Sequence, residues 1–86
     1  MKWLDRYKRD IKEPQTVMYA DVPHITVCVH TIHGLGNKLY LNCKELNIKD
    51  ADLNSDDFTE AVIKAKNIIW EEFIKIQKGV SEFCNN

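Results

Sequence analysis

The residue types best suited to bind a metal gather between positions 24 and 33. His24, Cys28, His30 and His33 offer the nitrogen and sulfur ligands that zinc takes. On an extended strand, His24, Cys28 and His30 share one face, but same-face neighbours lie roughly 6.6 Å apart. Closing a tetrahedron around zinc would need ligands from elsewhere in the chain. We therefore expect no metal site and interpret these residues as ordinary surface histidines on a sheet.

The same segment could hold a thiolate–imidazole pair, formed by Cys28 and His30. Nothing in the sequence marks an oxyanion hole or a third group to orient the imidazole, and a strand face encloses little space. Gly34 and Gly36 are spaced like glycines of a phosphate-binding loop, but no helix follows them, which favours a hairpin turn. The sequence therefore predicts no enzyme and no cofactor.

Acidic residues are concentrated between positions 50 and 60, where the charge sums to −5. Asp50, Asp52 and Asn54 fit the first ligand positions of an EF-hand calcium loop, but Ser55 and Ala61 replace its required Gly and Glu. The main expectation is a solvated acidic loop that leads into a helix. The alternative is a functional patch that mimics a phosphate backbone and occupies a basic groove on a partner. The residues of this patch are Asp50, Asp52, Asp56, Asp57 and Glu60.

Hydrophobic spacing predicts the elements that position these residues. Trp3, Leu4, Tyr7 and Ile11 follow a helical spacing, which predicts an N-terminal helix over 1–13. Alternation predicts a three-stranded antiparallel sheet over 16–48, and a long helix follows over 55–79. The expected fold is a single α+β domain over 1–86, ordered helix, three strands, helix, with the long helix on one face of the sheet.

The hairpin around Gly34-Leu35-Gly36 has a predictable register. If the apolar residues of both strands share the buried face, Val29 pairs with Leu41 and Val27 with Cys43. The open face then carries a mixture of polar and aromatic residues, namely His24, Thr26, Cys28, His30, Tyr40, Asn42 and Lys44.

The last helix has two apolar stripes. Ser55 or Asn54 is the expected N-cap. One continuous stripe is expected to pack across the sheet, formed by Phe58, Val62, Ala65, Ile69, Phe73, Ile76 and Val80. Ile63, Trp70 and Ile74 form a second stripe. We expect the N-terminal helix to cover it, or else a partner or a second copy in a homodimer.

Composition limits the function classes. The chain has 86 residues, a mass of 10.1 kDa and a formal charge of −1, which exclude a large enzyme and a strong general attraction to nucleic acid. No apolar run is long enough to cross a membrane, and the start MKWLDRYKRD differs from a signal peptide. Three cysteines without C-x-x-C spacing favour reduced thiols. We therefore expect a cytoplasmic protein that does not bind membranes.

Three families show a resemblance. The predicted topology, size and acidic pattern resemble small phage-encoded inhibitors, anti-CRISPR proteins among them. The element order and Ala65-Lys66-Asn67 resemble the double-stranded RNA-binding domain, although Asp56, Asp57 and Glu60 stand where that family has basic residues. The segment from Tyr40 to Phe73, with DDFTEAVIKAKNIIWEEF, is similar to the strand-to-helix half of HicB-type antitoxins.

These observations favour a small non-enzymatic module that binds a larger host protein. The first resemblance implies a phage or mobile-element inhibitor of a nucleic-acid-handling enzyme. The acidic patch would supply charge, and Tyr40, His30 and Trp70 would be apolar anchors. The alternative is a nucleic-acid-binding or antitoxin-type regulator that uses the basic residues of the N-terminal helix, Lys2, Arg6, Lys8, Arg9 and Lys12.

Overall fold

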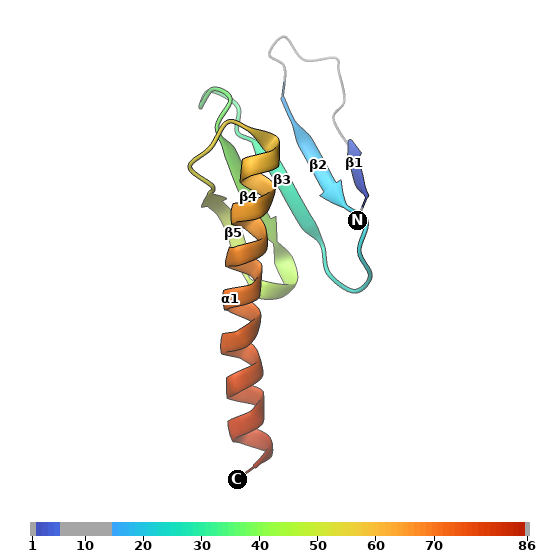
Figure 1. The fold of residues 1–86 in the computed structure, drawn as a ribbon, viewed down its shortest axis with the longest axis vertical. Helices are drawn as coiled ribbons and strands as arrows, with labels where there is room; N and C mark the ends of the chain where they lie inside the picture. Colours follow the sequence, from blue (N-terminus) through green and yellow to red (C-terminus); the bar gives the residue numbers. More distant parts are fainter. Residues whose placement is uncertain (1, 6–14, 86) are drawn as a thin grey trace.

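The protein is a five-stranded antiparallel sheet with one long helix across it, as the computed structural model shows (Figure 1). The structure describes residues 2–5 and 15–85. Neighbours in the chain are neighbours in the sheet, in the order β1-β2-β3-β4-β5. The strands are β1 (Trp3–Asp5), β2 (Val17–Ala20), β3 (Val27–Thr31), β4 (Leu39–Cys43) and β5 (Ile48–Asp52). A short 3-10 helix, η1 (Lys44–Leu46), joins β4 to β5, and α1 (Phe58–Cys84) ends the chain.

The prediction of an N-terminal helix is wrong, because Trp3–Asp5 form the edge strand β1. Trp3 pairs with Ala20 and Asp5 with Met18, which completes the sheet beside β2. The ring of Trp3 then meets the ring of Phe58 edge-on, with centroids 5.3 Å apart. Strand pairing and this aromatic contact outweigh the local helical spacing. The remainder of the predicted helix, residues 6–13, lies outside the described residues.

The sheet also has a strand that the sequence did not predict. Asn47 takes a left-handed conformation with φ 56° and closes η1, so that the chain reverses and β5 pairs with β4. Asp50 and Asp52, which were expected in a loop, are therefore strand residues. The predicted three-stranded sheet with two helices is corrected to five strands and one helix, still within the α+β class.

The predicted register of the central hairpin is confirmed. Val29 pairs with Leu41 and Val27 with Cys43. The turn uses positive φ at both glycines, 84° at Gly34 and 74° at Gly36. This pairing directs the apolar side chains of β3 and β4 toward the helix. Val29, Leu41 and Cys43 are fully buried there.

Two alanines seat α1 on the sheet. Ala61 and Ala65 are the buried residues of the helix, and they belong to the same core as Val29 and Leu41. Small side chains at these positions let the helix backbone approach β3 and β4. Leu53, just after β5, closes the core at one end with 1% of its surface exposed.

The helix is much longer than the sheet it crosses. At 1.5 Å per residue, its 27 residues span about 40 Å, whereas a five-residue strand spans roughly 17 Å. The first turns lie over β3 and β4, and the remainder extends beyond the sheet (Figure 1). The expectation that the whole stripe packs across the sheet is therefore wrong for Phe73, Ile76 and Val80, which are exposed. The N-cap is Asp57, in place of the expected Ser55 or Asn54.

Glycine-to-alanine variants test the turn and the helix in opposite directions. At Gly34, where φ is 84°, we expect Gly34→Ala to lower the free energy of unfolding by about 1 kcal/mol. Gly79 lies inside α1, and a Cβ there meets no atom within 4 Å. Gly79→Ala should therefore stabilise the protein by about 0.5–1 kcal/mol. Urea unfolding of both variants measures this, and equal effects at the two positions would contradict it.

Candidate functional site

The residues predicted to bind a partner lie in three separate regions of the structure. His30, Tyr40, Asp50 and Asp52 belong to the strands β3, β4 and β5, and Tyr40 pairs directly with both His30 and Asp52. This face is opposite the helix, because the alternate residues Leu39 and Leu41 are in the core. Asp56, Asp57 and Glu60 lie at the start of α1, and Trp70 lies on its far half. The predicted residues therefore do not form one continuous site.

On the open face of the sheet, His30, Asn42 and Asp50 form a hydrogen-bonded cluster. His30 Nδ1 lies 2.9 Å from the carbonyl oxygen of Thr31, and its Nε2 lies 2.9 Å from the Asn42 amide nitrogen. The backbone N–H of Asp50 donates to Asn42 Oδ1 at 2.6 Å, and Asp50 Oδ1 is 3.2 Å from His30 Nε2. The pairing of β4 with β5 shifts register between Leu41 and Cys43. Asn42 thus bonds an N–H that this bulge displaces, which gives the cluster a structural role.

Asp52 is also used within the sheet. Its carboxylate lies 2.8 Å from Lys38 Nζ, and its Oδ1 accepts the backbone N–H of Asn54 at 2.7 Å. The hydrogen bond from Lys38 holds the pKa of the Asp52 carboxyl below its ordinary value of 3.8, and the Asn54 N–H adds to this. The same hydrogen bond raises the pKa of Lys38. Both side chains are substantially exposed, so this pair contributes little to stability.

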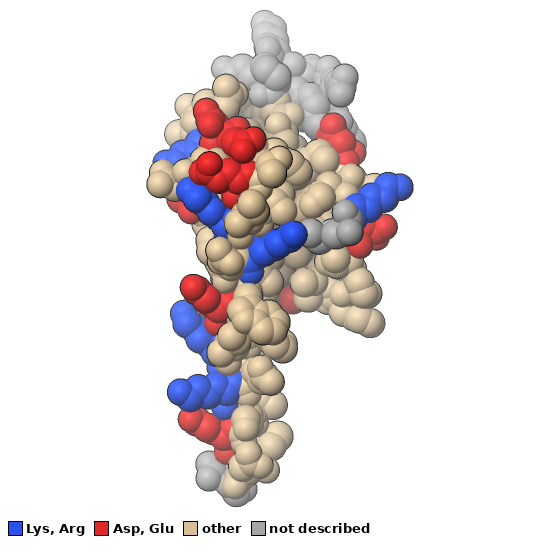
Figure 2. All heavy atoms as spheres, in the orientation of Figure 1, with Lys and Arg blue, Asp and Glu red and all other residues tan. Residues whose placement is uncertain are grey.

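Acidic side chains gather over the first turn of α1 and the loop before it (Figure 2). Asp57 Oδ2 accepts the N–H of Glu60 at 3.2 Å and caps the helix. Glu60 pairs with Lys64 at 3.2 Å, and Lys64 also donates to the carbonyl of Asn54. Asp56 forms no hydrogen bond or ion pair with any described residue. The acidic patch is therefore a set of carboxylates of which most have a structural partner.

The potential metal ligands and nucleophiles are not assembled for chemistry. His24 precedes β3 in a turn with φ 71°, so it is not on the predicted strand. Burial raises the pKa of the Cys28 thiol and of the Cys43 thiol, which keeps both protonated at neutral pH. Among residues 2–5 and 15–85, no group of three or more His, Cys, Asp and Glu side chains is placed to hold a metal ion.

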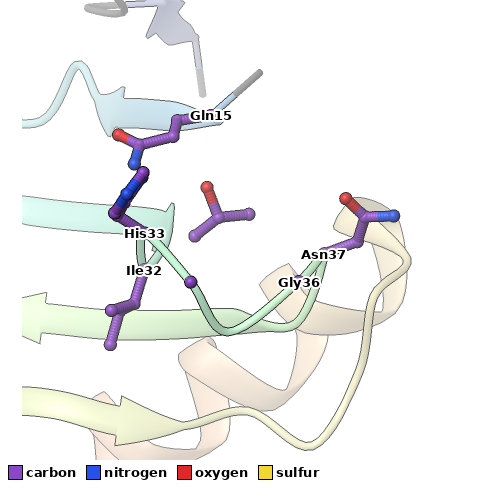
Figure 3. Close-up of a pocket in the computed structure, with 7 residues that line it drawn as sticks. Gln15, Ile32, His33, Gly36 and Asn37 are labelled. Carbon is purple, nitrogen blue, oxygen red and sulfur yellow. The ribbon is translucent and has the colours of Figure 1, made fainter. Parts of the chain in front are cut away.

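A hollow of about 260 Å³ lies beside the turn between β3 and β4 (Figure 3). Thr31, Gly34, Gly36 and Asn37 line it, and the side chains of Gln15 and His33 lie next to each other at its edge. The glycine-containing turn leads into β4, whereas a phosphate-binding loop leads into a helix. The geometry supports the hairpin interpretation of Gly34 and Gly36.

Exposed large hydrophobic residues gather on the part of α1 that extends beyond the sheet, residues 70–84, which we call the projecting half. Phe73, Ile76, Val80 and Phe83 lie along one side of it, with exposed fractions between 42% and 83%. Trp70 and Ile74 lie on another side, and the rings of Trp70 and Phe73 are 5.6 Å apart. In Figure 2 the charged side chains of this half follow one edge and the uncharged ones the other.

An apolar groove begins where the projecting half leaves the sheet. Its volume is about 240 Å³. Trp3, Val22 and Ile25 line it from the sheet side, and Val62, Ala65 and Ile69 line it from the helix. Neither this groove nor the projecting half was predicted from the sequence. The signal that could have found them is length, since the stripe continues for more turns than short strands can cover.

The comparisons with known proteins add no relative: no family model, curated protein or solved structure matches the chain. In the part of the chain that the structure describes, no helix is long and apolar enough to span a membrane.

The Asp52–Lys38 pair predicts a pH-dependent stability difference. Because the pKa of Asp52 is lowered on folding, its contribution is present above pH 3.8 and is lost as the pH falls through the folded pKa. Asp52→Asn keeps the acceptor for Asn54 but removes the charge. We expect this variant to unfold at slightly lower urea than the wild type at pH 7, and we expect the difference to disappear as the pH falls through the folded pKa of Asp52. Asp56→Asn is the matched control, and an equal loss at pH 7 would refute the assignment.

Proposed function

We propose that this protein is a non-enzymatic binding module that works by contact with other protein chains, and that the projecting half of α1 makes the contact. The observation that carries this proposal is the exposure of Phe73, Ile76, Val80 and Phe83 on one side of a helix that has left the sheet. Contiguous apolar surface of this kind marks interaction sites on soluble domains. Recognition of an amphipathic helix along its apolar face is a common mode of protein association.

The acidic patch supports a second, electrostatic contact with a larger and basic partner. Asp56, Asp57 and Glu60 stand at the end of α1 opposite the apolar stripe. Asp50 and Asp52 contribute less, because His30 and Lys38 lie beside them. An inhibitor of a nucleic-acid-handling host enzyme, of the phage-encoded kind, is the specific form of this proposal. A cytoplasmic setting belongs to it, and the free thiols of all three cysteines are compatible with that setting.

Direct nucleic-acid binding has less support. It depended on five basic side chains aligned on an N-terminal helix. In the described part of that segment, residues 2–5, Lys2 directly precedes the strand Trp3–Asp5. The other four basic residues, Arg6, Lys8, Arg9 and Lys12, lie outside the described residues. We therefore treat nucleic-acid binding as an outcome that the experiment can detect.

Affinity capture with matched variants tests the proposed function. The tagged protein is incubated with nuclease-treated host lysate, and retained proteins are identified by mass spectrometry. Ile76→Glu should remove proteins that the wild type retains, because it places a charge in the apolar stripe. Ile74→Glu is the control, since it changes the same residue type at nearly equal exposure, 44% against 46%, on the other side of the helix.

The acidic patch is tested in the same assay with Asp56→Asn combined with Glu60→Gln. We expect weaker retention of a larger partner at low salt and little difference at high salt, because screening removes the electrostatic contribution. Retention of the same proteins by wild type and Ile76→Glu would overturn the role of the projecting half. Salt-dependent binding of RNA or DNA by the purified protein would overturn the proposal in favour of a nucleic-acid-binding regulator.

A further inference from the structure

We infer that the partner of the projecting half is a second copy of this chain, which pairs with it as an antiparallel helix to form a symmetric dimer. This inference rests on the proposed function, because it names the occupant of the same surface. It also centres the contact on the side of α1 that carries Phe73, Ile76 and Val80, with Trp70 at its edge, and not on the Ile63, Trp70 and Ile74 stripe suggested by the sequence.

The spacing of the apolar residues is typical of two helices that pack side by side along one line of contact, which we call the seam. Ile69, Phe73, Ile76, Val80 and Phe83 follow each other at steps of four, three, four and three residues. This alternation has an average period of 3.5 residues, which keeps one narrow stripe facing a partner helix. Trp70 and Ile74 fall outside the stripe. The projecting half therefore has the pattern of a helix that packs against another helix.

The register that fills the seam also fills the groove. In an antiparallel pair, the two kinds of seam position face each other across the interface. Placing Phe73 opposite Ile76 of the second copy sets Ile69 opposite Val80, and Phe83 then comes opposite Lys66. Lys66 is on the rim of the groove lined by Trp3, Val62 and Ile69.

Phe83 is the most exposed of the large hydrophobic residues, at 83%. The groove, at about 240 Å³, has room for its phenyl ring. Its apolar lining matches that ring chemically. In this register, the Phe83 ring of each copy therefore fills the groove of the other copy.

The residues beside the seam are compatible with self-pairing. In the same register, Glu72 faces Gly79 of the second copy, and Trp70 faces Gln77. Like charges therefore do not meet, and Glu72 already has its own ion pair with Lys75 at 3.1 Å. Gly79 leaves room at its position, since a Cβ there would meet nothing within 4 Å.

The area is sufficient for a specific interface. The exposed parts of the stripe residues and Trp70 amount to about 500 Å² per chain, given that a large aromatic side chain buries about 150–250 Å². A pair then buries about 1,000 Å² of apolar side-chain surface, before any polar atoms are counted, which reaches the size expected of a biological interface.

The first test is the oligomeric state of the purified full chain, measured by sedimentation equilibrium over a range of concentrations. We expect a dimer of twice the 10.1 kDa chain mass. Ile76→Glu should weaken dimerisation more than about tenfold, because the substitution enters the interface twice. Ile74→Glu should leave the dimer intact. A wild type that stays monomeric, or equal dissociation by both variants, overturns the inference.

The second test reports the direction of pairing through Cys84, which is exposed, while Cys28 and Cys43 are buried. In the proposed register, Cys84 lies next to position 66 of the second copy. Lys66→Cys should therefore give a covalent dimer with a short thiol-specific bismaleimide, since positions 66 and 84 of one helix are about 27 Å apart. The wild type should not cross-link. Cross-linking of the wild type through Cys84 would indicate a parallel pair and overturn the antiparallel register.

The two proposals fail in different ways. A monomeric wild type whose capture of other proteins is lost in Ile76→Glu contradicts the dimer but supports the proposed function. A monomeric wild type whose capture is unaffected by Ile76→Glu contradicts both. A dimer that Ile76→Glu dissociates supports the inference whether or not a larger partner is retained.

Discussion

The packing of Ala61 and Ala65 against the central strands is the contact on which the rest of the structure depends. Both residues are buried against the core that contains Val29 and Leu41, and both are small enough to bring the helix close to the sheet. They lie in the first turns of α1, so the helix is fixed at one end only. The groove and the uncovered stripe both follow from this position, because the strands end long before the helix does.

Sequence reasoning succeeded where hydrophobic alternation and turn chemistry act together. The pairing of Val29 with Leu41 follows from the buried face and the two glycines of the hairpin. It failed at Trp3, whose strand pairs with β2, a partner distant in the chain. It also failed at Asp50, whose strand β5 forms only because the left-handed Asn47 reverses the chain. Long-range pairing overrides a short helical spacing, and nothing local in the sequence reports that pairing.

In the candidate site, too, the sequence shows which charged residues are present but not which groups they contact. The sequence correctly located the carboxylates between positions 50 and 60 but could not show their partners. Lys38 and the Asn54 N–H both engage Asp52, Lys64 engages Glu60, and Asp57 caps the helix. Carboxylates that satisfy neighbouring donors are less available to an external partner. Apolar side chains left outside the core offer the more informative signal for function.

The β5 edge of the sheet has a further consequence for how copies of this chain meet. An open strand edge is a template for addition of another strand, and long flat edges lead to aggregation. Here β5 carries a bulge, positive φ at Asp50, and alternating Lys49 and Asp50 charges, which together prevent a flat ladder from growing outward. Strand addition is thus disfavoured on this side of the sheet. Ordered growth into fibres from the β5 edge is thereby disfavoured, although the molecule still exposes a hydrophobic helix.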